Sequence, residues 1–182
     1  MSSNDMNSNL KKLVLTALFT ALTCVATMSI RIPTPGTSGY IHLGDALVIL
    51  SGVILGPAYG LVAGGLGSAM ADLLGGYFLY VPITFLIKGM ISLLSGLIYK
   101  HLGRTAKTRS LAVVFGGIVD IVFVTLGYFI FDYLMYGISA AVSIPASLVQ
   151  GIGGMVISIL LYPLLHRLVS LEIEGRTASS LH

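Results

Sequence analysis

Long apolar runs, interrupted by short clusters of glycine, proline and charged residues, make up most of the chain. Runs of this kind between turn signals are typical of membrane-spanning helices. The pattern divides the chain into six candidate spans, at residues 11–30, 45–57, 58–75, 82–100, 110–133 and 143–168. The second run is too short to cross a bilayer alone. It ends at Leu55-Gly56-Pro57, where glycine and proline predict a tight turn.

Composition supports the same fold class. Of the 182 residues 55% are hydrophobic and 9% are charged, so a water-soluble globule would lack enough polar side chains to cover its surface. We therefore predict an all-α, polytopic protein of the cell membrane, with six transmembrane helices in one domain at residues 11–170. Residues 1–10 form a polar segment without a cleavable signal pattern. Residues 171–182 contain Ile-Glu-Gly-Arg, a common engineered protease site, and are interpreted as an added tail.

The distribution of cationic residues predicts the orientation. With six spans, nearly all of the lysines and arginines near span ends fall on one side; they are Lys11, Lys12, Lys100, Arg104, Lys107, Arg109 and Arg167. The positive-inside rule makes this side the cytoplasm, so we expect both termini inside and only Arg31 in an external loop. Topology thus accounts for the net charge of +3, and nucleic-acid binding is not expected.

Polar side chains of the spans gather in one layer near the outer surface. Asp45 begins the second span, Asp72 and Asp132 lie near the outer ends of the third and fifth, and Lys88 and Gln150 lie about two turns into the fourth and sixth. Charged groups in a bilayer are costly unless paired or hydrated, so such a cluster usually marks a site. Simple solvation at span ends is the alternative, and it is strongest for Asp45 and Asp132.

Aromatic residues accompany this polar layer. One face of the fifth span combines rings with a carboxylate at helical spacing, at Thr125, Tyr128, Phe129, Asp132 and Tyr136. More rings lie near the outer surface, at Tyr40, Tyr77, Tyr80 and Phe85. Rings beside a polar anchor suit a flat solute, although an interfacial aromatic belt would also explain each tyrosine taken singly.

The segment between the first two spans, residues 31–44, is long for a link between packed helices. Its prolines restrict the backbone and its glycines supply hinges, as a lid requires. His42 lies in this segment, where it either contacts a ligand or hydrogen-bonds within the loop. Asp120 stands apart, near the middle of the fifth span, as a candidate hydrogen-bonding partner between helices.

Chemistry beyond binding has little support in the sequence. Cys24 is the only cysteine, so neither a disulfide within the chain nor a thiolate metal site is possible, and we expect no metal site. His42, Asp45 and Asp72 suggest an intramembrane enzyme only weakly, because no nucleophile and base occur at a recognisable spacing. A phosphate-binding G-x-x-x-x-G-K-[ST] sequence is absent.

Small residues predict the packing surfaces. The third span is rich in glycine and alanine, which let helices approach closely. In the first span, Ala17 and Ala21 form a small-xxx-small pair that either packs inside the protein or exposes a docking groove. Spacing alone favours internal packing.

Several motifs together resemble the substrate-binding S components of energy-coupling factor (ECF) vitamin transporters. The resemblance runs over nearly the whole chain and is carried by GYIHLGDAL at 39–47, LGPAYG at 55–60, the glycine-rich third span, FLIKG at 85–89, GYF at 127–129 and IPASLVQG at 144–151. Relatives often carry Asn where this chain has Ser147, so the local hydrogen bonds, and with them the ligand, can differ.

The resemblance implies a six-helix protein that binds a vitamin or precursor from outside, with the first external loop as its cap. It also implies a transmembrane T subunit and two cytoplasmic ATPases that use ATP and Mg, with no cofactor in this chain itself. The alanine motif of the family matches Ala17 and Ala21, which makes them candidates for docking to the T subunit.

The expected substrate-binding residues combine the polar layer, the rings and the resemblance. They are Tyr40, His42, Asp45, Phe85, Lys88, Tyr128, Asp132, Ser147 and Gln150. Hydroxymethylpyrimidine and pyridoxine are favoured as ligands, because both are small heterocycles with hydroxyls that these groups can engage. The resemblance leaves pantothenate and riboflavin possible as well, because similar proteins serve both, and Lys88 could pair with a carboxylate. A stand-alone secondary transporter or channel, with Asp120 as a proton relay, is the alternative function.

Overall fold

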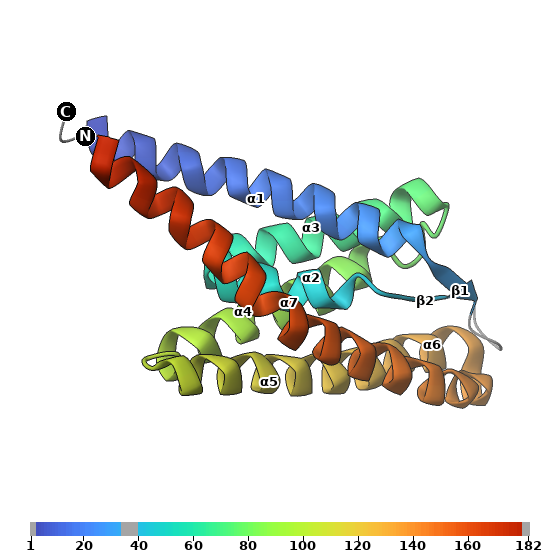
Figure 1. Ribbon diagram of the computed structural model, residues 1–182. Coiled ribbons are helices and arrows are strands. Elements are labelled where there is room, and N and C mark those ends of the chain that lie inside the picture. The colour runs from blue at the N-terminus through green and yellow to red at the C-terminus, as the bar shows by residue number, and fades with distance from the viewer. Residues whose placement is uncertain (1–2, 34–39, 180–182) are drawn as a thin grey trace.

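The structure is a computed structural model that describes residues 3–33 and 40–179. Helices lie along a common direction, and a short hairpin lies at one end of the molecule (Figure 1). The described chain approaches both termini at the opposite end, where the turn between α4 and α5 also lies (Figure 1). The two ends of the described chain therefore lie at the same end of the molecule as the turn between α4 and α5, and the orientation in a membrane stays a prediction.

The elements follow the predicted spans in order, but α1 begins at Ser3, before the predicted start at 11, and α7 continues to Ser179, beyond the predicted end at 168. In chain order they are α1 (Ser3–Ser29), β1 (Arg31–Pro33), β2 (Tyr40–His42), α2 (Asp45–Leu55), α3 (Pro57–Gly75), α4 (Val81–Leu102), α5 (Ala106–Val122), the π-helix η1 (Phe123–Gly127), α6 (Tyr128–Tyr136), the 3₁₀ helix η2 (Gly137–Ser143) and α7 (Ile144–Ser179). The fifth predicted span corresponds to α5, η1 and α6, which follow each other without a gap. The all-α class is confirmed, with a two-stranded hairpin added to it.

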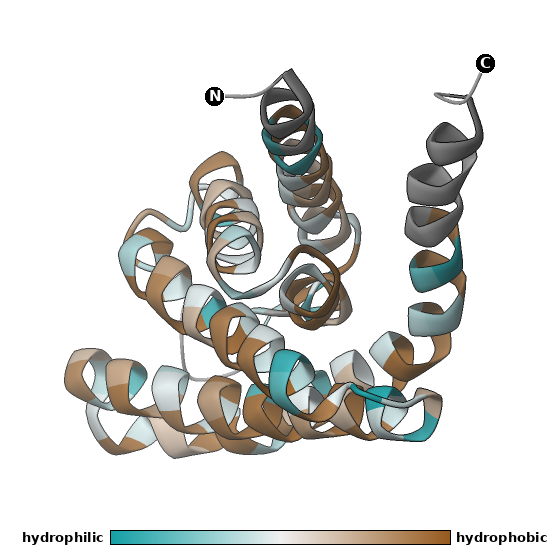
Figure 2. Cartoon of the chain, turned by 90° about the vertical axis from the view of Figure 1, so that its left-hand side faces the viewer, coloured by the Kyte–Doolittle hydropathy of each residue, from teal (hydrophilic) through white to brown (hydrophobic). Residues whose placement is uncertain are grey.

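Hydrophobic residues occur along the helices (Figure 2), and many of the large ones are exposed. Within the described residues, three helical stretches are long and apolar enough to cross a membrane, Asn9–Ser29, Val81–Leu102 and Ala106–Leu168. Leu134, Leu160 and Ile138 are more than two-thirds exposed. Such a surface is unsuited to water and suits contact with lipid.

The short helix α2 lies in the centre of the molecule. Its sequence is apolar on every side, and side chains all around it are buried, including Val48, Ile49 and Leu50. A helix that is hydrophobic all round belongs in a core. It packs against α1, α3, α4, α5 and α7. This central position explains why a run too short to cross a bilayer is nevertheless a regular helix.

Two glycines let α2 and α3 approach closely. After Gly56, whose positive φ of 87° ends α2, the chain reverses and Pro57 begins α3. A Cβ at Gly60 would lie 2.4 Å from Gly52 Cα, and a Cβ at Gly52 would lie 1.9 Å from the Ser92 carbonyl oxygen of α4. The three backbones therefore meet without intervening side chains, which confirms the predicted packing role of the glycine-rich third span.

The segment after α1 forms a hairpin. β1 and β2 are antiparallel, and Arg31 pairs with His42, Ile32 with Ile41, and Pro33 with Tyr40. Most of the predicted lid, residues 34–39, lies outside the described residues. Because β2 leads directly into α2, the hairpin holds Tyr40 and His42 over the end of the bundle where the polar layer was expected (Figure 1).

Candidate substrate-binding site

An ion pair lies at the centre of the polar layer. Lys88, two turns into α4, extends to α2, where its ammonium bonds to Oδ1 of Asp45 at the first helical position. Both side chains are completely buried. Solvation at the end of a span is therefore excluded for Asp45. Removing two charges from water is costly, and their mutual attraction together with further hydrogen bonds must offset that cost.

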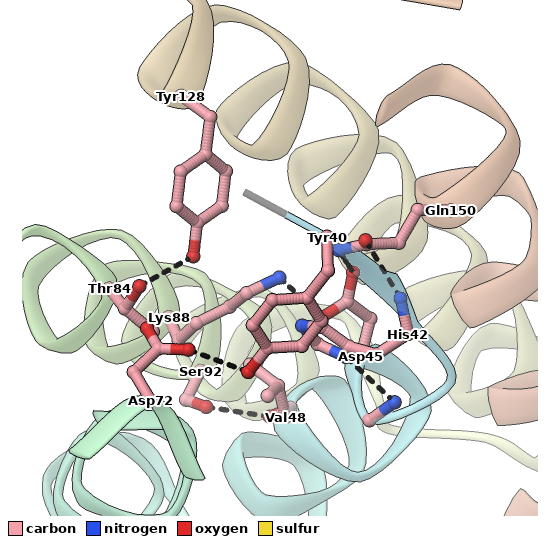
Figure 3. A network of polar contacts seen from close by, with 11 residues as sticks. Tyr40, His42, Asp45, Val48, Asp72, Thr84, Lys88, Ser92, Tyr128 and Gln150 are labelled. Carbon is pink, nitrogen blue, oxygen red and sulfur yellow. Dashed lines mark hydrogen bonds and ion pairs between the residues drawn. The ribbon is translucent and has the colours of Figure 1, made fainter. Parts of the chain in front are cut away.

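Gln150 of α7 provides one of these hydrogen bonds and connects the pair to the hairpin. Its Nε2 donates to Asp45 Oδ2 at 2.8 Å, and its Oε1 accepts from the His42 main-chain N–H at 3.1 Å. Since a carboxylate only accepts, these two contacts fix the orientation of the amide. One side chain thus joins α7, α2 and β2 (Figure 3).

His42 is held within its own loop. Its Nδ1 accepts from the Gly44 N–H at 3.1 Å, so the ring must be neutral at that atom. The pKa of His42 is lowered to about 4, mainly by burial and also by the Lys88 and Arg31 charges, while the Asp45 carboxylate opposes this shift. The structure shows the predicted hydrogen bond of His42 within the loop, and contact of His42 with a ligand stays a prediction.

Tyr40 fixes the hairpin to α3. Its hydroxyl donates to Asp72 Oδ1 at 2.6 Å, and its ring lies 4.5 Å from that of Tyr77. Arg31 holds the same corner, because its guanidinium lies 4.9 Å from the Tyr40 ring and donates to the Ala71 carbonyl at 2.9 Å. Burial, followed by the nearby Asp72 carboxylate, raises the pKa of Tyr40, so the hydroxyl remains a donor.

A third group of contacts comes from the start of α4 and from α6. The Tyr80 hydroxyl donates to Asp132 Oδ1 at 2.7 Å, and Asp132 is only 3% exposed. Tyr128 lies next to Tyr80, shares a 3.0 Å hydrogen bond with Thr84, and places its ring 5.6 Å from the Lys88 ammonium. Through Tyr80, this ring links the Asp132 region to the central ion pair. Figure 3 shows Tyr128 with Thr84 and Lys88.

Asp120 differs from the other aspartates. It is fully buried on α5, and neither carboxyl oxygen has a hydrogen-bond partner within the described part of the chain. The expectation that it bonds a neighbouring helix is therefore wrong. Gly154 of α7 makes room for it, because a Cβ at that glycine would lie 3.2 Å from Asp120 Oδ2 and 2.7 Å from Asp45 Cβ. Asp120 thus adds a further acidic group beside the ion pair.

Most of the predicted binding residues lie in this connected set. Hydrogen bonds or ring contacts join Tyr40, His42, Asp45, Lys88, Tyr128, Asp132 and Gln150 either to one another or to a shared neighbour. Ser147 is buried one turn before Gln150 on α7. Phe85 has a different neighbour, since its ring packs close to Gly65 of α3, and its contact with a ligand stays a prediction.

Sequence reasoning missed several members of the set. Thr84 and Ser92 lie four residues before and after Lys88, so helical spacing would have been enough to identify them on the same face of α4. The Ser92 hydroxyl donates to the Val48 carbonyl at 2.6 Å. On α6 sequence reasoning did not single out Phe131, whose ring lies next to that of Tyr80, whereas Phe129 contacts Tyr133 of the same helix. The π-helix η1 contains Thr125 and precedes the other four residues of the predicted face, so it changes only the position of Thr125 relative to them.

The sequence is similar to known membrane transport proteins. Residues 7–167 match the family model described as the S component of the ECF-type riboflavin transporter. The chain belongs to this S-component family. A Pyrococcus woesei protein is 39% identical over 73% of this chain and 86% of its own length. The thiamine precursor transporter HmpT of Lactococcus lactis subsp. cremoris is 34% identical over 88% of this chain and 91% of its own length.

Solved S components share the fold. The S component of a bacterial ECF transporter superposes with a TM-score of 0.65 at 23% identity, covering 88% of this chain and 98% of that one. The S component for biotin gives 0.70 at 22% identity, covering 93% and 95%. At such identities only the fold is shared, so the ligand of this S component has to be inferred from its own side chains.

The alanine pair of this S component lies on an open surface. Ala17 and Ala21 are both exposed, whereas Thr16 and Phe19, on the other side of α1, are buried against the bundle. Leu13, Val14 and Leu18 are exposed as well, at 57%, 60% and 51%. The expectation of internal packing, which rested on spacing alone, is wrong, and the pair lies on an apolar strip that no other described helix covers.

Proposed function

We propose that this chain captures a small water-soluble vitamin or vitamin precursor from outside the cell, as the substrate-binding subunit of an ECF importer. The favoured ligands are hydroxymethylpyrimidine and pyridoxine. The observation that carries the proposal is the buried set of polar and aromatic side chains around Lys88 and Asp45, which the hairpin covers through Tyr40 and His42. Membership of the S-component family supports the transport class.

The likeness to HmpT favours a thiamine precursor within this class. Hydroxymethylpyrimidine is a flat ring with amino and hydroxyl groups, and the site offers tyrosine rings beside carboxylate and amide acceptors. Tyr128 and Tyr40 supply rings, and Asp132 and Gln150 supply polar contacts. Pantothenate and riboflavin are less suited, the first because it brings a carboxylate and the second because it is much larger.

Uptake requires further subunits in this proposal. A transmembrane T subunit docks on the exposed strip of α1 at Ala17 and Ala21, and two cytoplasmic ATPases supply energy from ATP and Mg. The six-helix bundle spans the membrane with both termini inside, so that the hairpin and the site face outward in the resting state. Small residues suit a docking surface because they let a partner helix approach closely.

Mass spectrometry of small molecules released from the purified protein tests the ligand. We expect a vitamin-like heterocycle in near-stoichiometric amount. Uptake of that ligand into vesicles tests the mechanism, and it should require the T subunit, the ATPases and ATP. Uptake by this chain alone, driven by an ion gradient, would instead support the stand-alone transporter.

A variant pair tests the docking surface. Replacing both Ala17 and Ala21 with Trp should abolish ATP-driven uptake and leave ligand affinity unchanged, since both alanines lie on the outer side of α1. Leu160→Trp is the matched control, because Leu160 is 71% exposed on a different helix, α7. Equal uptake by the alanine variant and the control would contradict docking at this strip.

A further inference from the structure

The site contains more acidic than basic groups. Four buried aspartates occur in or beside it, Asp45, Asp72, Asp120 and Asp132, and none is more than 4% exposed. Within the described residues, the cations near them are Lys88 and Arg31. How these two cations are engaged determines which ligand charge the site accepts.

Lys88 is not free to bind an anion. Its ammonium is completely buried, pairs with Asp45 and lies beneath the Tyr128 ring. A carboxylate ligand that took this ammonium would leave Asp45 buried without its counter-charge, bonded only to Gln150. Leaving a buried charge unpaired costs several kcal/mol in proteins generally, so the exchange is unfavourable.

Arg31 is engaged as well. Its guanidinium donates to the Ala71 carbonyl near the end of α3 and lies over two rings, at 4.9 Å from Tyr40 and 5.7 Å from Tyr77. The contacts hold the hairpin against α3. An anion that recruited Arg31 would weaken the contacts that keep Tyr40 over the site.

Two further carboxylates of the site, those of Asp72 and Asp132, accept hydrogen bonds. Asp72 and Asp132 each receive a tyrosine hydroxyl on Oδ1, at 2.6 Å and 2.7 Å. A carboxylate has several acceptor positions, so one such bond does not exhaust it. The tyrosine rings next to these carboxylates provide flat apolar surface. Acceptors beside rings fit a ligand that is itself flat and donates hydrogen bonds.

We propose that the site selects its ligand by charge: it takes an aromatic nitrogen heterocycle that bears amino or hydroxyl donors and no acidic group, and it rejects vitamins that carry a carboxylate. This inference rests on the proposed function and narrows it. It replaces the expectation that Lys88 is available for a carboxylate ligand, because Asp45 already neutralises that charge.

Matched ligand pairs test the inference. Pyridoxine and pyridoxic acid differ by a hydroxymethyl group exchanged for a carboxylate, and so do hydroxymethylpyrimidine and its pyrimidine carboxylate. Titration calorimetry near neutral pH should show at least one of the alcohols binding about 100-fold more tightly than its acid. An acid that binds as tightly as its alcohol, or more tightly, would overturn the inference.

Two further measurements test the inference, the ligand preference of an Asp45→Asn variant and the identity of the ligand released from the wild-type protein. Asp45→Asn removes the counter-charge of Lys88, so the preference for alcohol over acid should shrink by about tenfold or more. An unchanged ratio would contradict the role of the ion pair. If this variant does not fold, or if neither pair binds, the ligand released from the wild-type protein decides. A released carboxylate overturns charge selection and leaves the transport function standing, whereas ATP-driven uptake of no vitamin at all contradicts the proposed function itself.

Discussion

Lys88 and Asp45 form an ion pair whose two side chains are both fully removed from solvent. The two residues come from different helices, and the pair joins α4 to the first turn of the central helix α2. Breaking a buried pair by removing one partner generally costs 3–5 kcal/mol, because the other charge remains buried. The pair therefore fixes the position of the hairpin end of α2 as well as the charge of the site.

A double-mutant cycle tests this coupling. Lys88→Met and Asp45→Asn should each lower the free energy of unfolding in detergent by about 3 kcal/mol, and the double variant should lose about 1–3 kcal/mol less than the sum. Lys100→Met is the matched control, since Lys100 is exposed on the same helix, and it should change stability by less than about 0.5 kcal/mol. Additive losses would mean that the two groups do not stabilise each other.

Close helix contacts give a second prediction. A Cβ at Gly60 would lie 2.4 Å from Gly52 Cα, whereas a Cβ at Gly153 would meet nothing within 4 Å. Gly60→Ala should lower the free energy of unfolding by about 1–3 kcal/mol through overpacking. Gly153→Ala should be neutral or raise it by about 0.5–1 kcal/mol, because alanine is favoured over glycine inside a helix. Thermal unfolding of the two variants in the same detergent measures both effects, and a Gly60→Ala variant as stable as Gly153→Ala would refute the close approach.

Helices were predictable because the signals that define them are local. Apolar runs set the helix bodies, and glycine and proline set the ends, so Pro57 begins α3 within one residue of the predicted start. The hairpin was not predictable in the same way. Its strands have three residues each, and β1 ends in a proline, which is a poor strand residue. Its pairing depends on contacts with α3 and α7 that are distant in sequence.

The polar layer was predictable, but its internal partnerships were not. Depth along each span placed Asp45, Lys88 and Gln150 at one level, because helix rise per residue is constant. Which carboxylate pairs with Lys88 depends on the rotation of each helix about its axis and on the positions of the loops, which the sequence does not specify. Asp120 illustrates the limit, since its position predicted a hydrogen-bond partner and the described structure provides none.

Acid should destabilise the protein through His42, which lies in the hairpin outside the helices. Burial lowers the pKa of His42 to about 4, whereas an unfolded histidine titrates near 6.5. Between these values the unfolded chain binds more protons than the folded one, so stability is fully present above about pH 6.5 and falls as pH decreases towards 4. The loss reaches about 3 kcal/mol, and chemical denaturation of detergent-solubilised protein across this range measures it.

His42→Asn separates this contribution from those of the carboxylates. Asparagine retains an acceptor that can bond a main-chain N–H two residues later, as His42 does with Gly44, and it does not titrate. The variant should therefore lose less stability than the wild type between pH 6.5 and pH 4, although both should respond alike to further acidification. Parallel curves for the two proteins over the whole range would show that His42 is protonated equally in both states.

The Tyr40 hydroxyl should control how long a bound ligand stays under the hairpin. It donates to Asp72 at 2.6 Å, and a hydrogen bond to a charged group contributes about 1.5–3 kcal/mol. Tyr40→Phe keeps the ring contacts with Arg31 and Tyr77 but removes this bond, so the ligand should dissociate about tenfold faster or more, with a smaller change in association rate. Tyr77→Phe is the matched control, because Tyr77 belongs to the same ring stack and its hydroxyl has no hydrogen bond within the described residues. Stopped-flow measurement of ligand release distinguishes them. Equal release rates for the two variants would mean that the ring stack alone, without the Tyr40 hydroxyl, holds the hairpin closed.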